Sequence, residues 1–177
     1  MSIMTKDSLK TGYSKAVKQP DDIQSRLQTH LKEGSPHLLT YEILGGAQFM
    51  VNEPKSNIDY ITASNNGIPK LSIVKLAEVM DVPMKEMAVL LSVSYKTLGR
   101  KKPTDKLDSL SSSLSIEIAN TIAKGLSVFE STDKLNRWLQ KGNRALQGKK
   151  PFNLLNTPTG IKMVTHILGR LEEGVYT

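Results

Sequence analysis

A run of polar and basic side chains at residues 94–103 has the composition of a nucleic-acid contact. Lysine and arginine bind phosphate oxygens, arginine also pairs with guanine, and hydroxyl groups add single hydrogen bonds. No acidic residue interrupts the run. The alternative is that these residues form only the solvated basic edge of a small helical core. The side chains that we predict to contact DNA are those of Ser94, Tyr95, Lys96, Thr97, Arg100, Lys101 and Lys102.

The segment from Met84 to Lys101 has the spacing of a helix-turn-helix, which would present these side chains. Ala88 falls where the first helix must approach the second closely. Ser92 and Val93 supply a short turn, although Ser92 replaces the glycine that is usual there. Leu98 anchors the second helix in the core. The segment therefore predicts two short helices joined by a tight turn.

The exposed face of the second helix follows from the position of Leu98. If Leu98 points inward, Lys96 and Arg100 point nearly the opposite way. Each is two positions from Leu98, and two steps of about 100° turn a helical side chain by about 200°. A helix of about eight residues is about 12 Å long, and the major groove of DNA is about 12 Å wide. Lys101 stands where an apolar residue is common, so we expect this helix to be short. The size and charge of the exposed face suit the major groove.

Side chains for catalysis are scarce in this sequence. The absence of cysteine excludes disulfide bonds, thiolate metal sites and cysteine nucleophiles. His30, His37 and His166 lack the short spacing of a metal site. Residues 142–150 differ from a phosphate-binding loop in glycine spacing and lack the serine or threonine that binds magnesium. An enzyme is therefore the least favoured interpretation, and we expect no metal and no cofactor.

The length and charge of the chain indicate a small protein with an anionic partner. Its 177 residues allow one domain or two small ones. The net charge of +7 favours an anionic partner, and nucleic acid is one such class. The amino terminus lacks the apolar segment of a secretion signal, and no apolar run reaches the roughly 20 residues that cross a bilayer. We expect a soluble, cytoplasmic protein with no membrane partner.

Apolar residues recur with helical spacing along most of the chain, so we predict a mainly α fold. The best alternating, strand-like pattern is limited to residues 41–51. A short helix is expected at residues 21–31, after a polar amino-terminal stretch. The clearest apolar stripes lie in residues 71–80, 84–91, 118–129, 135–139 and 161–171.

Capping residues mark the expected helix ends in the second half of the chain. Ser115, at the end of the serine-rich residues 109–115, is the predicted N-cap of the helix that carries the 118–129 stripe. Gly142 is predicted to end the next helix in the left-handed conformation. Thr157 followed by Pro158 predicts the start of the last helix.

The carboxy-terminal residues form an ordered set of motifs. From Trp138 the chain reads Trp-Leu, then Asn-x-Ala-Leu-x-Gly, then Pro-x-x-Leu-Leu-x-Thr, a glycine and a final helix that ends near Gly-Val. Weaker motifs precede them in order: Leu44-Gly45-Gly46, Gly67-Ile68-Pro69 and Ser92-Val93-Ser94. The pattern resembles the MbcA/ParS/Xre antitoxins over about residues 38–177. The family usually has Pro-Asn where this chain has Gly142-Asn143, and Lys149-Lys150 makes the following loop unusually basic.

The resemblance implies a type II antitoxin. Such proteins bind and silence a RES-domain toxin, encoded by the adjacent gene, whose family degrades NAD or transfers ADP-ribose from it. The antitoxin or the complex represses the shared promoter. In this family the carboxy-terminal end lies over the toxin's active site, so Tyr176 and the Thr177 carboxylate are candidates for blocking the NAD cavity.

Toxin contacts are therefore expected in the carboxy-terminal motifs and the last residues. For Trp138 and Leu155 the alternative role is the protein's own core, and for residues 175–177 the alternative is a frayed tail. The residues predicted to bind the toxin are Trp138, Asn143, Leu146, Pro151, Leu154, Leu155, Thr157, Val175, Tyr176 and Thr177.

We divide the chain into three parts: a partly flexible amino-terminal arm (1–36), a helix-turn-helix DNA-binding region (37–103) and a small helical toxin-binding domain (104–177). A helix-turn-helix normally reads two half-sites about 34 Å apart, so we predict a homodimer. The stripe of Ile118, Ile122 and Phe129 is the candidate dimer surface. The competing interpretation is a freestanding helix-turn-helix regulator whose carboxy-terminal half only dimerises.

Overall fold

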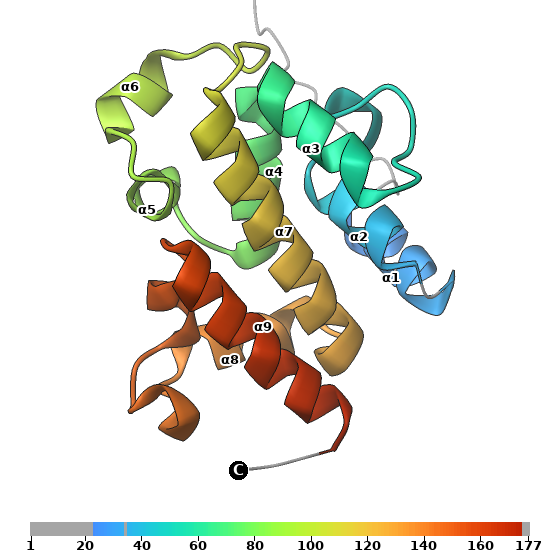
Figure 1. The fold of residues 1–177 in the computed structure, drawn as a ribbon, viewed down its shortest axis with the longest axis vertical. Coiled ribbons are helices and arrows are strands. Elements are labelled where there is room, and N and C mark those ends of the chain that lie inside the picture. The colour runs from blue at the N-terminus through green and yellow to red at the C-terminus, as the bar shows by residue number, and fades with distance from the viewer. Residues whose placement is uncertain (1–22, 34, 175–177) are drawn as a thin grey trace, which may run out of the picture.

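The computed structural model describes residues 23–33 and 35–174, and in these ranges the chain is helical (Figure 1). Within them no strand forms, and the β-type pairing is limited to one bridge between Pro69 and Lys106. The predicted mainly α fold is confirmed. The α-helices are α1 (Ile23–Glu33), α2 (Pro36–Ile43), α3 (Asn57–Asn66), α4 (Lys70–Met80), α5 (Met84–Leu90), α6 (Tyr95–Arg100), α7 (Ser109–Phe129), α8 (Thr132–Gln140) and α9 (Pro158–Glu172), and the 3₁₀ helices are η1 (Gly46–Gln48), η2 (Arg144–Leu146) and η3 (Pro151–Leu154).

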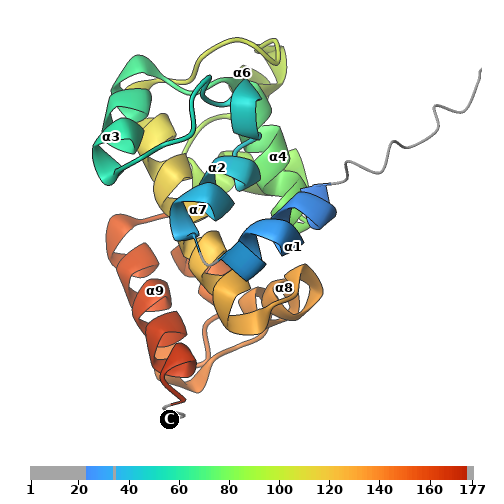
Figure 2. The ribbon, with the colours of Figure 1, turned by 90° about the vertical axis from the view of Figure 1, so that its right-hand side faces the viewer.

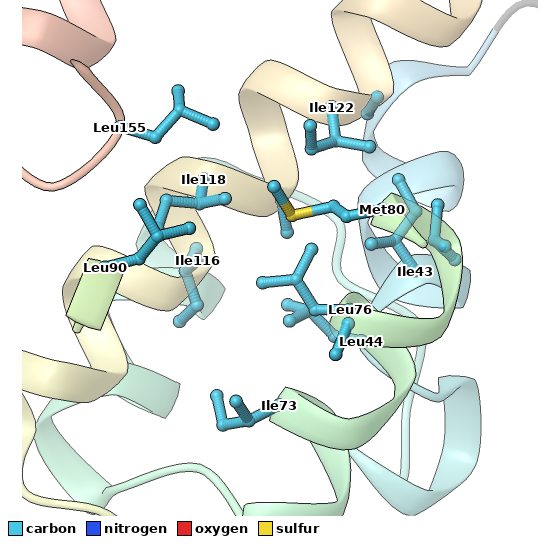
Figure 3. Close-up of a cluster of buried hydrophobic side chains, with 14 of the residues drawn as sticks. Ile43, Leu44, Ile73, Leu76, Met80, Leu90, Ile116, Ile118, Ile122 and Leu155 are labelled. Carbon is cyan, nitrogen blue, oxygen red and sulfur yellow. The ribbon is translucent and has the colours of Figure 1, made fainter. Parts of the chain in front are cut away.

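Helix α7 is the central element of the molecule. It packs against α2 and α3 and also against α8 and α9 (Figures 1 and 2). Most of the buried apolar side chains form one cluster that extends from Leu27 in α1 to Leu168 in α9. Figure 3 shows its centre, where residues of α7 meet side chains from α2, α4 and α5 as well as Leu155. Residues on both sides of position 103 therefore contribute to a continuous core.

The candidate dimer stripe on α7 proves to be part of this core. Ile118 and Ile122 are fully buried within the single chain, and Phe129 packs against Trp138 with ring centroids 5.6 Å apart. Side chains already covered by their own chain cannot form a free dimer surface. The assignment of the stripe to dimerisation was wrong. An apolar stripe on a helix shows that another surface must cover it, but it does not show whether that surface belongs to the same chain or to a second copy.

The beginning of α7 also differs from the prediction. The helix starts at Ser109 rather than near Ser115, and Ser115 is buried inside it, donating a hydrogen bond from Oγ to the Ser111 carbonyl oxygen at 2.6 Å. Ser112 is also buried, and its Oγ accepts a hydrogen bond from the backbone N–H of Ile68 at 3.0 Å. A serine hydroxyl can be buried inside a helix when it donates a hydrogen bond to a backbone carbonyl oxygen or accepts one from a nearby backbone N–H. The N-cap is Asp108, whose Oδ1 accepts from the Ser111 N–H at 2.8 Å.

Replacing the cap at Asp108 should reduce stability in a pH-dependent way. The Ser111 backbone hydrogen bond holds the pKa of Asp108 below its ordinary value. This contribution is present above about pH 3.9, the value of a free aspartate, and is lost as the pH falls through the lower folded-state pKa. We expect Asp108→Ala to lower the free energy of unfolding by about 1 kcal/mol at pH 7. Urea unfolding at pH 7 and pH 3 measures this change.

The matched control is Asp108→Asn, which keeps an oxygen acceptor but does not titrate. Its stability should lie close to that of the parent at pH 7 and should fall less on acidification. Identical acid dependence in the parent and in Asp108→Asn would show that the carboxylate does not contribute through its charge.

Two further helix ends were predicted, one rightly and one wrongly. Thr157 caps α9, since its Oγ1 accepts from the Gly160 N–H at 3.1 Å. Gly142 does not have the predicted left-handed conformation: α8 ends at Gln140, and the left-handed residues of the following loop are Gln147 (φ 55°) and Gly148 (φ 79°). A glycine at position 142 serves close packing, because a Cβ there would lie 2.6 Å from the Gly148 carbonyl oxygen.

The described parts of the chain contain neither a membrane-spanning helix nor a cluster of metal-ligating side chains. None of those helices combines the length and apolar character that crossing a membrane requires. No group of three His, Asp or Glu side chains in them is arranged to hold a metal ion.

Candidate functional site

Helices α5 and α6 occupy the segment predicted to form a helix-turn-helix. Residues 91–94 connect them, and Ser92 adopts a positive φ of 55° where the motif usually has glycine. The N–H of Val93 donates to the Ala88 carbonyl oxygen at 3.0 Å, which closes the turn. Ala88 and Leu98 are buried, as their spacing predicts, and α5 packs against α6. The geometry is consistent with the helix-turn-helix hypothesis.

Helix α6 is shorter than the eight residues expected from the groove width. It contains six residues and ends at Arg100, in agreement with the expectation of an early end at Lys101. Its N-cap is Ser94, whose Oγ accepts from the Thr97 N–H at 2.9 Å and shares a 2.7 Å hydrogen bond with the Thr97 hydroxyl. Both hydroxyls are therefore engaged in capping the helix. Tyr95 is 57% exposed and remains accessible to a partner.

The basic residues around α6 fall into two groups. Lys96, Arg100 and Lys102 are exposed, and their side chains form no ion pair with any described residue. Lys101 differs, because its Nζ donates to the Lys106 carbonyl oxygen at 2.7 Å. The ammonium group of Lys101 therefore already holds the following loop in place, which makes its predicted contact with DNA the least accessible of the set.

Lys70 of α4 completes this network, and no sequence motif marks it for this role. Its Nζ donates to the Lys101 carbonyl oxygen at 2.6 Å and to that of Gly99 at 3.4 Å. These carbonyls lie at the carboxy-terminal end of α6, where a cation is favourable for the helix dipole. A helix of six residues needs such tertiary support, because short helices are unstable alone. Lys70 therefore fixes the end of α6.

Removing the Lys70 ammonium should loosen α6 without unfolding the protein. In Lys70→Met we expect hydrogen exchange of the α6 amides to accelerate about fivefold, corresponding to about 1 kcal/mol. Lys75→Met is the matched control, since Lys75 lies on the same helix and pairs with Glu78 at 2.8 Å. Equal exchange at α6 in the two variants would refute the role of Lys70.

The carboxy-terminal motifs build a tight loop between α8 and α9. Asn143 organises it: its Oδ1 accepts from the Ala145 N–H at 2.9 Å, and its backbone pairs with Lys149 and Gly148 at 3.0 and 2.9 Å. Thr157 then caps α9, as described above. Two of the predicted toxin-binding polar residues thus determine the backbone of this region, whatever else they contact.

The apolar residues predicted to bind the toxin are mostly covered by their own chain. Leu146, Pro151 and Leu155 are buried. For Leu155 the core alternative is what the structure shows. Trp138 and Leu154 are half-buried, so part of each side chain remains exposed. Their contact with a toxin stays a prediction, and Val175, Tyr176 and Thr177 lie outside the described residues.

A polar contact that the sequence did not suggest joins α8 to α4. The Asn136 Nδ2 donates to the Val79 carbonyl oxygen at 2.9 Å. Asn136 directly follows the buried Leu135 in the sequence, and this position is the one feature that could have indicated its contact. The contact fixes the orientation of α8, which carries Trp138, relative to α4, the helix that also holds the end of α6.

The loop between α8 and α9 and both of these helices lie within a segment that matches a known protein family. Residues 124–174 match the family described as the antitoxin Xre/MbcA/ParS C-terminal toxin-binding domain. The match runs from within α7 to just beyond the end of α9, and over these residues it confirms the resemblance to MbcA/ParS/Xre antitoxins. A chain in the crystal structure of the M. tuberculosis MbcT-MbcA toxin-antitoxin complex is 18% identical, with a TM-score of 0.45 over 70% of this chain and 100% of that one. No curated protein matches this chain.

Proposed function

We propose that this chain, an antitoxin of the Xre/MbcA/ParS type by its residues 124–174, neutralises a RES-domain toxin encoded by the adjacent gene and represses their shared promoter. The observation that carries the proposal is the family match to residues 124–174, which includes the end of α7, both α8 and α9, and the loop between them. The protein acts by occupying surfaces of other macromolecules and not by catalysis.

Neutralisation requires that the antitoxin cover the toxin's active site. Residues 175–177 follow α9 after Glu173 and Gly174, and we assign them to the NAD-binding cavity of the toxin. The exposed parts of Trp138 and Leu154 would supply apolar contact beside it. Deleting Val175–Thr177 should relieve inhibition in an NAD-consumption assay while the complex still forms in size-exclusion chromatography. Undiminished inhibition by the truncated chain would remove this assignment.

Promoter binding is assigned to the exposed face of α6. Lys96 and Arg100 contact DNA bases or phosphates, and Lys102 contacts the phosphate backbone of the DNA. Tyr95 adds a hydrogen bond to the DNA. A protein that reads two half-sites binds as a homodimer. With the Ile118 stripe buried, the dimer must use a different surface.

Two substitutions separate base contacts from phosphate contacts. Arg100→Ala should weaken binding to the promoter upstream of this gene about 10- to 100-fold, since a paired arginine–guanine contact contributes about 1–3 kcal/mol. Lys102→Ala should lower the slope of log K against log salt by about one. A gel-shift titration at several salt concentrations measures both effects. Affinities equal to the parent's in both variants would contradict the role of this face.

A further inference from the structure

The positive charge of the chain is concentrated in its carboxy-terminal part. Between Asp133 and Glu172 no acidic residue occurs, so all 17 Asp and Glu residues of the chain lie outside this interval. Its formal charge therefore exceeds the net charge of +7 of the whole chain. The cations of the interval are Lys134, Arg137, Lys141, Arg144, Lys149, Lys150, Lys162 and Arg170.

Four of these cations lie in residues 141–150, which we call the basic loop. Lys141, Arg144, Lys149 and Lys150 are all exposed. The Asn143 hydrogen bonds described above close the loop, and Gly142 and Gly148 bring its two ends side by side. Hydrogen bonds therefore fix the backbone that carries these four cations, so the charges are attached to one short and ordered loop.

The cations of the basic loop form no ion pair within the described chain, although Lys150 lines the same hollow as Glu86 of α5. Cations elsewhere do form pairs: Lys124 lies 3.0 Å from Glu172, and Lys75 lies 2.8 Å from Glu78. The side chains of the four loop cations form no ion pair and donate no hydrogen bond to a described residue. Clustered, unpaired like charges destabilise a compact fold, and this cost is recovered when an anionic partner binds.

From this we infer that the basic loop docks on an acidic surface of the toxin and accelerates the encounter of the two proteins. The inference rests on the proposed antitoxin function. It names the chemistry of the toxin surface beside the active site, which is a cluster of Asp and Glu side chains that face the loop. Charge complementarity of this kind acts mainly on the association rate, and bulk salt weakens it.

A protein partner is favoured over DNA for two reasons. The basic loop lies inside residues 124–174, which match the toxin-binding family. It also lies far from α6 along the molecule, since Figure 1 places α6 near one end of the long axis and the orange segment after α8 near the other. The groove-facing side of α6 and the basic loop are therefore separate surfaces.

The test compares association rates of the RES-domain toxin with the parent antitoxin and with the triple variant Arg144→Gln, Lys149→Gln and Lys150→Gln. In stopped-flow measurements at about 20 mM salt we expect the triple variant to associate about tenfold more slowly. At about 300 mM salt the difference should shrink, because the Debye length falls to about 6 Å. The melting temperatures of parent and variant should agree, since all three side chains are exposed.

The matched control removes three exposed cations outside the toxin-binding unit: Lys32→Gln, Lys55→Gln and Lys85→Gln. Its association rate should stay within twofold of the parent's. Equal rates for the loop variant and the parent at low salt would overturn the inference and leave the antitoxin function standing, whereas a parent chain that does not associate with the toxin overturns that function itself. A loop variant that loses affinity for promoter DNA while its toxin association is unchanged would reassign the loop to nucleic acid and overturn the inference.

Discussion

Gly160→Ala is expected to lower the free energy of unfolding by about 3 kcal/mol and the melting temperature by about 10 °C. Gly160 lies in the first turn of α9, where the backbone passes directly against the carbonyl oxygen of Leu154 in η3. An added Cβ would overlap that oxygen, and a backbone group cannot turn aside as a flexible side chain can. Thermal unfolding followed by circular dichroism measures the change.

Gly169→Ala is the matched control for this substitution, in the same helix. A Cβ at position 169 would meet only the end of the Lys124 side chain, at 3.6 Å. Alanine has the higher helix propensity, so this variant should be as stable as the parent or up to about 1 kcal/mol more stable. If both variants melt at the same temperature, the close approach of α9 to η3 is not the reason that position 160 requires glycine.

Gly160 also illustrates what the sequence could and could not predict. The glycine after the Thr157-Pro158 start is visible as a motif, and the cap itself follows from local rules that the structure confirms. The reason for the glycine is a contact with η3, and no local rule predicts which carbonyl will lie there. The same limit applies to Ser115, whose burial against α7's own carbonyls depends on the neighbours that surround the helix.

The candidate DNA-binding face shows the same division. The exposure of Lys96 and Arg100 follows from helical geometry once Leu98 points inward, and the structure agrees. Composition alone could not show that Lys101 and Lys102 differ. The Nζ of Lys101 donates to the Lys106 carbonyl oxygen, whereas the Nζ of Lys102 makes no such contact with a described residue. Lys70 lies about thirty positions earlier in the chain, so only the folded structure brings it to the end of α6.

The central position of α7 predicts that the two proposed binding surfaces unfold together. Ile122 is fully buried where α7 meets its neighbours, and Ile122→Ala should lower the free energy of unfolding by about 3 kcal/mol through the loss of buried methyl groups and the resulting cavity. Ile58→Ala on α3 is the control, because Ile58 is 66% exposed and its truncation should cost less than about 0.5 kcal/mol.

The cooperativity of this unfolding can be followed with two probes. Trp138 is the single tryptophan of the chain, so its fluorescence reports on the region around α8, whereas far-ultraviolet circular dichroism reports on all helices. Because α7 packs against helices from both halves, we expect the two urea transitions of the parent to coincide and to shift together in Ile122→Ala. Separate midpoints would mean that residues 104–177 unfold independently of the preceding helices. Coincident transitions would mean that a core substitution far from α6 and from the loop between α8 and α9 removes both proposed binding surfaces at the same denaturant concentration. Neither surface can persist once the shared helix α7 is lost.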